Sequence, residues 1–314
     1  MTRTLVCLSV LASATCAAAQ SGSGPVQWLS DPQQAVRAAQ NANRPLLVWI
    51  IPPQRERVPN GDGDKLENRQ EHALRESVVV RQMRKFVPLR LNRGAYRDAA
   101  RDFGFSEAAG FEIRFVTPDG QSLGAVPSSD VAVAETLARR MAVAFEDFVK
   151  RVYTRDVQPK LEDKEAKPAD LKAALKLVSE FRIAAADRGV IALLERERLD
   201  AGARTAVYEA LAAVSTKDAV GKLLDLARGG DAGATKALEK VTPVGAELLA
   251  AELKPDAPHF DYLVYRIVTR ASRVSYAKPE RFFDNADTAQ KTEEVQRVSD
   301  VVKQAAEKWK AEND

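Results

Sequence analysis

The sequence predicts an α/β domain followed by an all-α domain. Residues 45–51, PLLVWII, form an unbroken apolar run rich in branched side chains, which is typical of a strand buried on both faces. Shorter strand patterns alternate with helical ones up to residue 153, and from residue 154 only short amphipathic helices are indicated. A chain of 314 residues is long enough to form two such domains, each with its own core.

The first 19 residues have the pattern of a secretory signal peptide. Arg3 supplies an early positive charge, an apolar run extends from Leu5 to about Leu11, and small residues precede Gln20. We expect cleavage after Ala19, with residues 20–27 as a flexible leader. The protein is therefore expected to be periplasmic or extracellular.

Two other readings of this segment are weaker. A lipoprotein signal would use Cys16, but Ser13 stands where such signals usually carry a leucine-like residue. A membrane anchor would need roughly 20 apolar residues, far more than the run contains. We expect no membrane span.

Cleavage would remove both cysteines, Cys7 and Cys16. Thiol–disulfide exchange requires a thiolate, so the mature chain is not expected to be a thiol–disulfide oxidoreductase. Loss of Arg3 lowers the formal net charge from +3 to +2, and basic and acidic residues are interleaved throughout. A nucleic-acid-binding protein would normally show a basic stripe, so we expect no nucleic-acid partner.

The first domain is expected to span residues 28–153. Ser30, Asp31 and Pro32 begin a helix with a capping residue and a proline in the first turn. After strand 45–51, Pro52 and Pro53 end the strand, and a polar loop runs to about residue 66. The remaining elements are expected in this order: helix 67–85 with a break near Ser77, strand 86–92 at an edge or bulge because of Pro88, helix 96–105, strand 111–117, a Pro-Asp-Gly turn, a hairpin strand 121–127, and helix 130–153.

This order resembles the thioredoxin fold, through DPQQAVRAAQNANRPLLVWII, KFVPLRLN and FEIRFVTPDGQSLG. The resemblance covers about residues 28–150. It implies a catalytic C-x-x-C just after the first core strand, but residues 52–55 are PPQR, and the place of the family's cis-proline is taken by Phe111 or a neighbour. The resemblance therefore predicts a fold for this domain but not the family's activity.

Residues 154–168, charged and punctuated by proline, are expected to be a linker or the edge of the second domain, and residues 169–314 a helical domain. DAGARTAVYEALAAV (200–214) and DAGATKALEKV (231–241) are alike, and each follows a similar helix, which indicates a repeat of about 30 residues. The pattern resembles short HEAT-like repeats in an α-solenoid; an irregular helical bundle is the alternative. A long helix from about Thr288 is expected to cap the domain.

One candidate metal site is present in the sequence. Asn60, Asp62, Asp64 and Glu71 occupy positions 1, 3, 5 and 12 of a calcium-loop template. Lys65 replaces the template's glycine, so a solvated acidic loop is the preferred reading. His72 and His259 lack partners at zinc-ligand spacing, and we expect no cofactor.

The sequence therefore predicts a non-catalytic, exported protein that binds or scaffolds protein partners. The binding residues are expected at the former active site of the resemblance: Trp49, Pro52, Pro53 and Phe111. Two alternatives stay open, an ATP-independent chaperone that holds unfolded clients, and a carboxylate- or metal-dependent enzyme using the loop 54–71.

Overall fold

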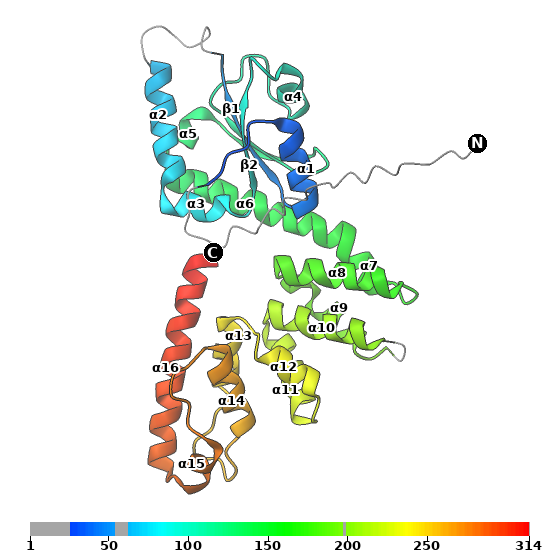
Figure 1. Ribbon diagram of the computed structural model, residues 1–314, viewed down its shortest axis with the longest axis vertical. Helices are drawn as coiled ribbons and strands as arrows, with labels where there is room; N and C mark the ends of the chain where they lie inside the picture. Colours follow the sequence, from blue (N-terminus) through cyan, green and yellow to red (C-terminus); the bar gives the residue numbers. More distant parts are fainter. Residues whose placement is uncertain (1–25, 54–61, 197–198, 314) are drawn as a thin grey trace, which may run out of the picture. The chain divides into compact units, whose positions relative to one another are not determined.

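The computed structural model describes residues 26–53, 62–196 and 199–313 (Figure 1). The predicted signal peptide with its cleavage site lies outside these residues, as do both cysteines and Asn60. The chain divides into two compact units, residues 1–145 and 146–314. The structure is thus mixed α/β, with one four-stranded sheet in the first unit and a helical second unit.

The sheet has the strand order β2-β1-β3-β4. Its strands are β1 (Leu46–Ile51), β2 (Val87–Asn92), β3 (Ile113–Val116) and β4 (Ser122–Val126). Strand β1 pairs in parallel with β2 and antiparallel with β3, and β3 pairs antiparallel with β4. All six residues of β1 are buried, as its unbroken apolar run predicts.

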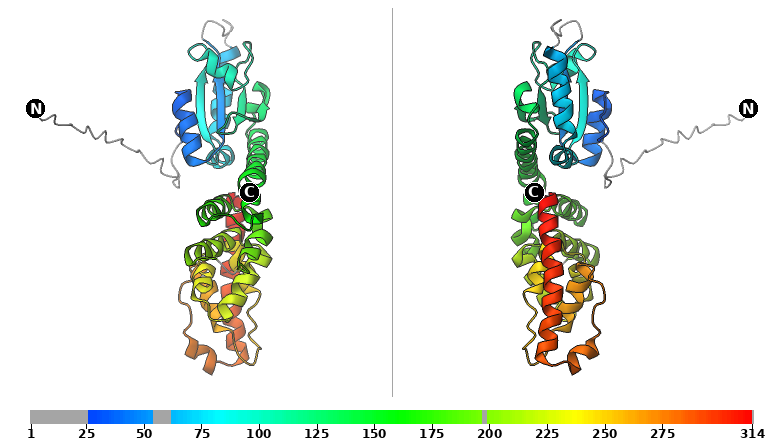
Figure 2. Two further views of the ribbon diagram at one scale, coloured as in Figure 1. Left: turned by 90° about the vertical axis from the view of Figure 1, so that its right-hand side faces the viewer. Right: turned by 90° about the vertical axis from the view of Figure 1, so that its left-hand side faces the viewer.

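The helices of the first unit cover both faces of this sheet, and Figure 2 shows α1 and α6 on opposite sides of it. The helices are α1 (Pro32–Ala42), α2 (Asp62–Arg75), α3 (Ser77–Met83), α4 (Arg97–Asp102), α5 (Ser128–Val131) and α6 (Ala134–Val152). Leu46, Val48 and Ile50 pack with Ala35 and Ala39 of α1. Alternate residues of β1 point to the other face, so Trp49 faces α2.

Pro88 lies on an outer strand of the sheet, as its missing N–H predicts. The outer side of β2 is paired locally by the chain that precedes α1. The N–H of Leu29 donates to the carbonyl of Pro88 at 3.0 Å, and the carbonyl of Leu29 accepts from the N–H of Arg90 at 2.8 Å. This short bridge occupies the carbonyl of Pro88 and the N–H of Arg90 on the outer side of β2.

The second unit begins inside helix α6. Its elements are η2, a π-helical turn (Tyr153–Val157), α7 (Gln158–Glu162), α8 (Pro168–Phe181), a 3₁₀ turn η3 (Ala184–Ala186), α9 (Asp187–Leu193), α10 (Ala201–Val214), α11 (Lys217–Arg228), α12 (Ala232–Leu238), α13 (Pro243–Ala250), α14 (Tyr262–Ala271), α15 (Glu280–Asn285) and α16 (Thr288–Asn313). The prediction of a linker at 154–168 is therefore corrected. Residues 153–162 are helical and belong to the second unit, because the buried side chains of Val157 and Leu161 attach them to its core.

Alternate helices of this unit pack against one another. Helix α8 contacts α10 and α10 contacts α12, whereas α9 contacts α11 and α11 contacts α13. Helix α16 packs along α13, at the place where the sequence predicts a terminal capping helix. These contacts link alternate helices into two rows.

The two Asp-Ala-Gly segments have equivalent roles in this arrangement. Asp200 caps α10 by accepting from the N–H of Ala203, and Asp231 caps α12 by accepting from the N–H of Ala234. The following glycines allow close approach. A Cβ on Gly233 would lie 2.9 Å from the Tyr208 ring. The sequence similarity therefore reflects a repeated helix start.

Candidate functional site at the carboxyl end of strand β1

Three chain segments meet where β1 ends. Pro52 and Pro53 leave β1, Gly94 follows β2, and Gly110 precedes β3. A Cβ on Gly94 would lie 3.0 Å from Cγ of Pro53, and one on Gly110 would lie 3.4 Å from Cγ of Pro52. The two glycines thus let the neighbouring loops pack directly on the Pro-Pro pair, which fixes the start of the segment that follows β1.

A fully buried glutamine, Gln70 of α2, holds these segments together. Its Oε1 accepts a hydrogen bond from Nε1 of Trp49 at 3.0 Å. Its Nε2 donates to the carbonyl of Phe111 at 3.0 Å and to that of Ser128 at 2.7 Å. One amide side chain therefore ties together β1, the segment before β3 and the start of α5.

Phe111 has an uncommon backbone conformation, with φ of 58°. A non-glycine residue in this left-handed region is strained by about 1–2 kcal/mol. Its N–H donates to the carbonyl of Ile50 at 3.0 Å, and the N–H of Ile50 donates to the carbonyl of Glu112 at 3.0 Å. These bonds, with the one from Gln70, hold the strained residue in place. Such over-determined strain tends to gather at functional sites.

Trp49 is enclosed on its other sides. The guanidinium of Arg90 lies 4.9 Å from the centre of the indole ring, and the ring of Trp28 lies 5.7 Å away. Nη2 of Arg90 is in turn 2.7 Å from Oε1 of Glu67 and 3.2 Å from Oε1 of Glu71. The indole is only 2% exposed, so Trp49 positions its surroundings and does not itself offer a contact surface.

The structure thus brings the four predicted binding residues together at one end of the sheet. Trp49, Pro52 and Phe111 are buried there, and Pro53 is half-buried. Gly94, which packs on Pro53, belongs to the turn after β2, where Oδ1 of Asn92 accepts from the N–H of Gly94 at 3.0 Å. This turn presents Tyr96, whose side chain is 39% exposed.

Two residues of the site were missed by sequence reasoning. Gln70 had a signal that could have found it: with Leu66, Ala73 and Leu74 it lies on one helical face, where a lone polar residue points into the core and needs partners. Tyr96 had no comparable signal, because its position depends on the turn geometry after β2.

The calcium template covers Asn60, which lies outside the described residues, together with Asp62, Asp64 and Glu71. The expected loop is shorter than predicted, because α2 already begins at Asp62 and so includes Asp64. Glu71 contacts Arg75 at 3.5 Å as well as Arg90. Within the described part of the chain, no group of three or more His, Cys, Asp or Glu side chains could hold a metal ion.

Comparison of the chain with models of protein families, with curated proteins and with solved structures gave no match. Among the residues described, no helix combines the length and apolarity that crossing a membrane requires.

Proposed function

We propose that this chain is a non-catalytic, exported protein that binds a protein partner, built from a thioredoxin-like domain without reactive thiols and a stack of HEAT-like helices. The observation that carries the proposal is the fixed arrangement at the end of β1. There Gln70 bonds to the indole of Trp49 and to the backbone of Phe111 and so holds three chain segments together.

The fold assignment is supported by the sheet. Its order β2-β1-β3-β4, with β1 and β2 parallel and the β3–β4 hairpin antiparallel, is the arrangement that the resemblance implies. The Pro52–Pro53 pair directly follows β1, at the place where that family carries its reactive cysteines. The HEAT-like assignment is supported by the two rows of helices and by the repeated Asp-Ala-Gly helix starts.

The chemistry of the surface favours a protein partner. Pro53 and Tyr96 are rigid side chains that lose little conformational entropy on binding, and tyrosine is enriched among residues that dominate binding energy. The network of Gln70 fixes the backbone around them before any partner arrives. Preorganisation of this kind lowers the entropic cost of association.

The experiment is quantitative capture by the chain that starts at residue 20. It is immobilised and incubated with the exported proteins of its producing cell, and the Kd of each retained protein is then measured. We expect a discrete partner whose Kd rises on Tyr96→Ser. The matched control is Val143→Ser, which alters another exposed apolar side chain of the same unit, 53% exposed on α6.

Three results would overturn the proposal. A partner that binds Tyr96→Ser as tightly as the native chain would place binding elsewhere. Suppression of aggregation of an unrelated unfolded client, without a discrete partner, would favour the chaperone. Calcium or zinc retained by the purified chain would favour the metal-dependent enzyme.

A further inference from the structure

The loop between α14 and α15, residues 272–279, carries a tyrosine that packs against almost nothing. Tyr276 is 93% exposed and has a left-handed backbone, with φ of 59°. Arg273 of the same loop also has a positive φ, of 52°. Arg273 has a structural reason for this conformation, because it ends α14: the N–H of Val274 donates to the carbonyl of Thr269 at 2.8 Å. Tyr276 lies beyond that helix end.

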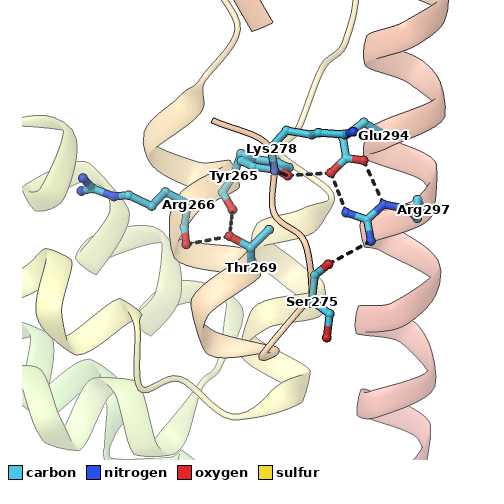
Figure 3. Close-up of polar contacts among 7 residues, drawn as sticks. All are labelled: Tyr265, Arg266, Thr269, Ser275, Lys278, Glu294 and Arg297. Carbon is cyan, nitrogen blue, oxygen red and sulfur yellow. Dashed lines mark hydrogen bonds and ion pairs between the residues drawn. The ribbon is translucent and has the colours of Figure 1, made fainter. Parts of the chain in front are cut away.

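A buried polar network lies beneath the loop (Figure 3). Oη of Tyr265 donates to Oε1 of Glu294 at 2.6 Å. Nη2 and Nε of Arg297 donate to the two oxygens of Glu294 at 2.7 and 2.9 Å. Tyr265 is fully buried and Glu294 is 4% exposed, so the network joins α14 to α16 inside the second unit.

This network fixes the loop on both sides of Tyr276. The N–H of Lys278 donates to Oη of Tyr265 at 2.7 Å, and Nη1 of Arg297 donates to the carbonyl of Ser275 at 3.3 Å. Both anchors are backbone groups, which hold the chain whatever side chains the loop carries. The loop therefore presents Tyr276 in one backbone conformation, although the tyrosine side chain gains no burial there.

The loop that carries Tyr276 is basic in sequence, and Nζ of Lys278 lies 5.3 Å from the centre of the Phe282 ring. Residues 272–279 include Arg273 and Lys278 and no acidic residue, and Arg281 follows in α15 after Glu280. Within the described residues, no acidic side chain forms an ion pair with Arg273 or Arg281. Arg270 differs, because it already pairs with Glu239.

We propose that the loop 273–278 binds an acidic segment of a partner protein, with Tyr276 as the central anchor and Arg273 and Lys278 beside it. Tyrosine is enriched among residues that dominate binding energy, and a backbone held before binding lowers the entropic cost of association. The local positive charge selects acidic over basic segments by electrostatic complementarity. This surface is separate from the end of β1, and the inference does not depend on that site.

The test uses a displayed library of random peptides, selected on the full chain. We expect enrichment of Asp and Glu in the bound peptides. For one synthetic peptide from the selection, Tyr276→Ala should raise the Kd about 30-fold, as expected for loss of a dominant aromatic anchor. Tyr276→Phe should retain most of the affinity. Arg273→Glu should weaken binding and reduce its dependence on salt.

Two controls separate this result from unfolding and from the first site. Because the side chain of Tyr276 is exposed, Tyr276→Ala should keep the native circular dichroism spectrum. Tyr96→Ala, which changes an exposed tyrosine of the other unit, should leave the Kd of the acidic peptide unchanged.

Each contrary outcome has a definite meaning. Selected peptides without acidic enrichment, or equal binding by Tyr276→Ala, would overturn the proposal. Concentration-dependent self-association that Tyr276→Ala abolishes would replace the acidic partner with a second copy of the chain. Binding to vesicles of anionic lipid that depends on Tyr276 would replace it with a membrane surface.

Discussion

Nε1 of Trp49 donates to Oε1 of Gln70 across 3.0 Å in a fully buried setting. Nε2 of the same Gln70 side chain donates hydrogen bonds to the carbonyls of Phe111 and Ser128. One side chain thus satisfies the buried indole N–H of Trp49, the buried carbonyl of Phe111 and the partly buried carbonyl of Ser128. Leaving such groups without a hydrogen bond is costly.

We expect Gln70→Ala to lower the free energy of unfolding of the first unit by about 3 kcal/mol, because it leaves an indole N–H and two carbonyls without partners. Urea denaturation in a Trp309→Phe background measures this change. Trp28 and Trp49 then report on the first unit alone. Gln34→Ala, on the exposed face of α1, is the matched control and should change stability by less than about 0.5 kcal/mol. A similar loss in both variants would show that the network contributes nothing specific.

The second prediction concerns the start of α12. Asp231 accepts from the N–H of Ala234 at 2.9 Å and from Oη of Tyr208 at 2.7 Å. Burial opposes ionisation of Asp231, but the hydrogen bonds from Tyr208 and from the helix N–H groups outweigh it and hold the pKa below its ordinary value. Asp231→Ala should cost about 1–2 kcal/mol, since it removes a helix cap and leaves the hydroxyl without its partner.

Hydrogen exchange of the α12 amides measures this loss locally. A double-mutant cycle with Tyr208→Phe separates the cap from the hydroxyl contact, because the two changes share one hydrogen bond. We expect the double variant to be more stable than the sum of the single effects predicts. Strict additivity would mean that Oη of Tyr208 does not interact with Asp231.

The third prediction is a pH dependence in the second unit. Burial opposes ionisation of Glu294, yet the hydrogen bonds from Arg297 and Tyr265 outweigh it and lower the pKa below its ordinary value of 4.5. Burial and the bond to Glu294 raise the pKa of Tyr265, which therefore stays protonated as a donor. A carboxylate with a lowered folded-state pKa stabilises the fold above its unfolded pKa, and this contribution is lost as the pH falls through the folded value.

Glu294→Gln should accordingly destabilise the chain at pH 7, and the difference from the native chain should shrink as the pH falls below about 4.5. Hydrogen exchange of the α14 and α16 amides across this pH range gives the comparison within the second unit. Glu293→Gln, at the exposed neighbouring position, is the control and should show no such convergence. A constant difference between the native chain and Glu294→Gln would argue against the proposed ionisation.

The fourth prediction tests the backbone strain at Tyr276. Tyr276→Gly should raise the free energy of unfolding by up to about 1 kcal/mol, because glycine adopts a positive φ without the clash of a Cβ atom. Tyr276→Ala keeps the Cβ and should leave stability within about 0.5 kcal/mol of the native value. Thermal unfolding of the two variants distinguishes them. A fall in stability with glycine would indicate that the tyrosine side chain contributes to packing.

The elements of the first unit were predictable because their signals are local. The apolar run of β1, the break near Ser77 and the hairpin around Pro118-Asp119-Gly120 each depend on neighbouring residues, and all three are confirmed. Pro88 on an outer strand follows from its missing N–H. In the second unit the two Asp-Ala-Gly segments gave the helix starts that the structure has.

The remaining features depend on contacts between distant residues. The boundary between the units lies inside α6. The sequence does not reveal it, because the amphipathic pattern of a helix continues unbroken from one hydrophobic core to the next. Charge and proline suggested a linker after residue 153, but Val157 and Leu161 bury enough apolar surface to continue the helical structure. At the candidate site, the end of β1 could be predicted from the sequence. The hydrogen-bond partners of Gln70 could not, because they come from segments that only the folded chain brings together.

The bridge between Leu29 and β2 has a consequence for behaviour at high concentration. An open strand edge offers N–H and C=O groups on which a strand from another molecule can form, and this is a common route to aggregation. At residues 88–90 this edge has no N–H at Pro88, and Leu29 occupies both the carbonyl of Pro88 and the N–H of Arg90. A foreign strand would have to displace Leu29 before it could bond there, so the short segment before α1 protects this part of the β2 edge from edge-to-edge association.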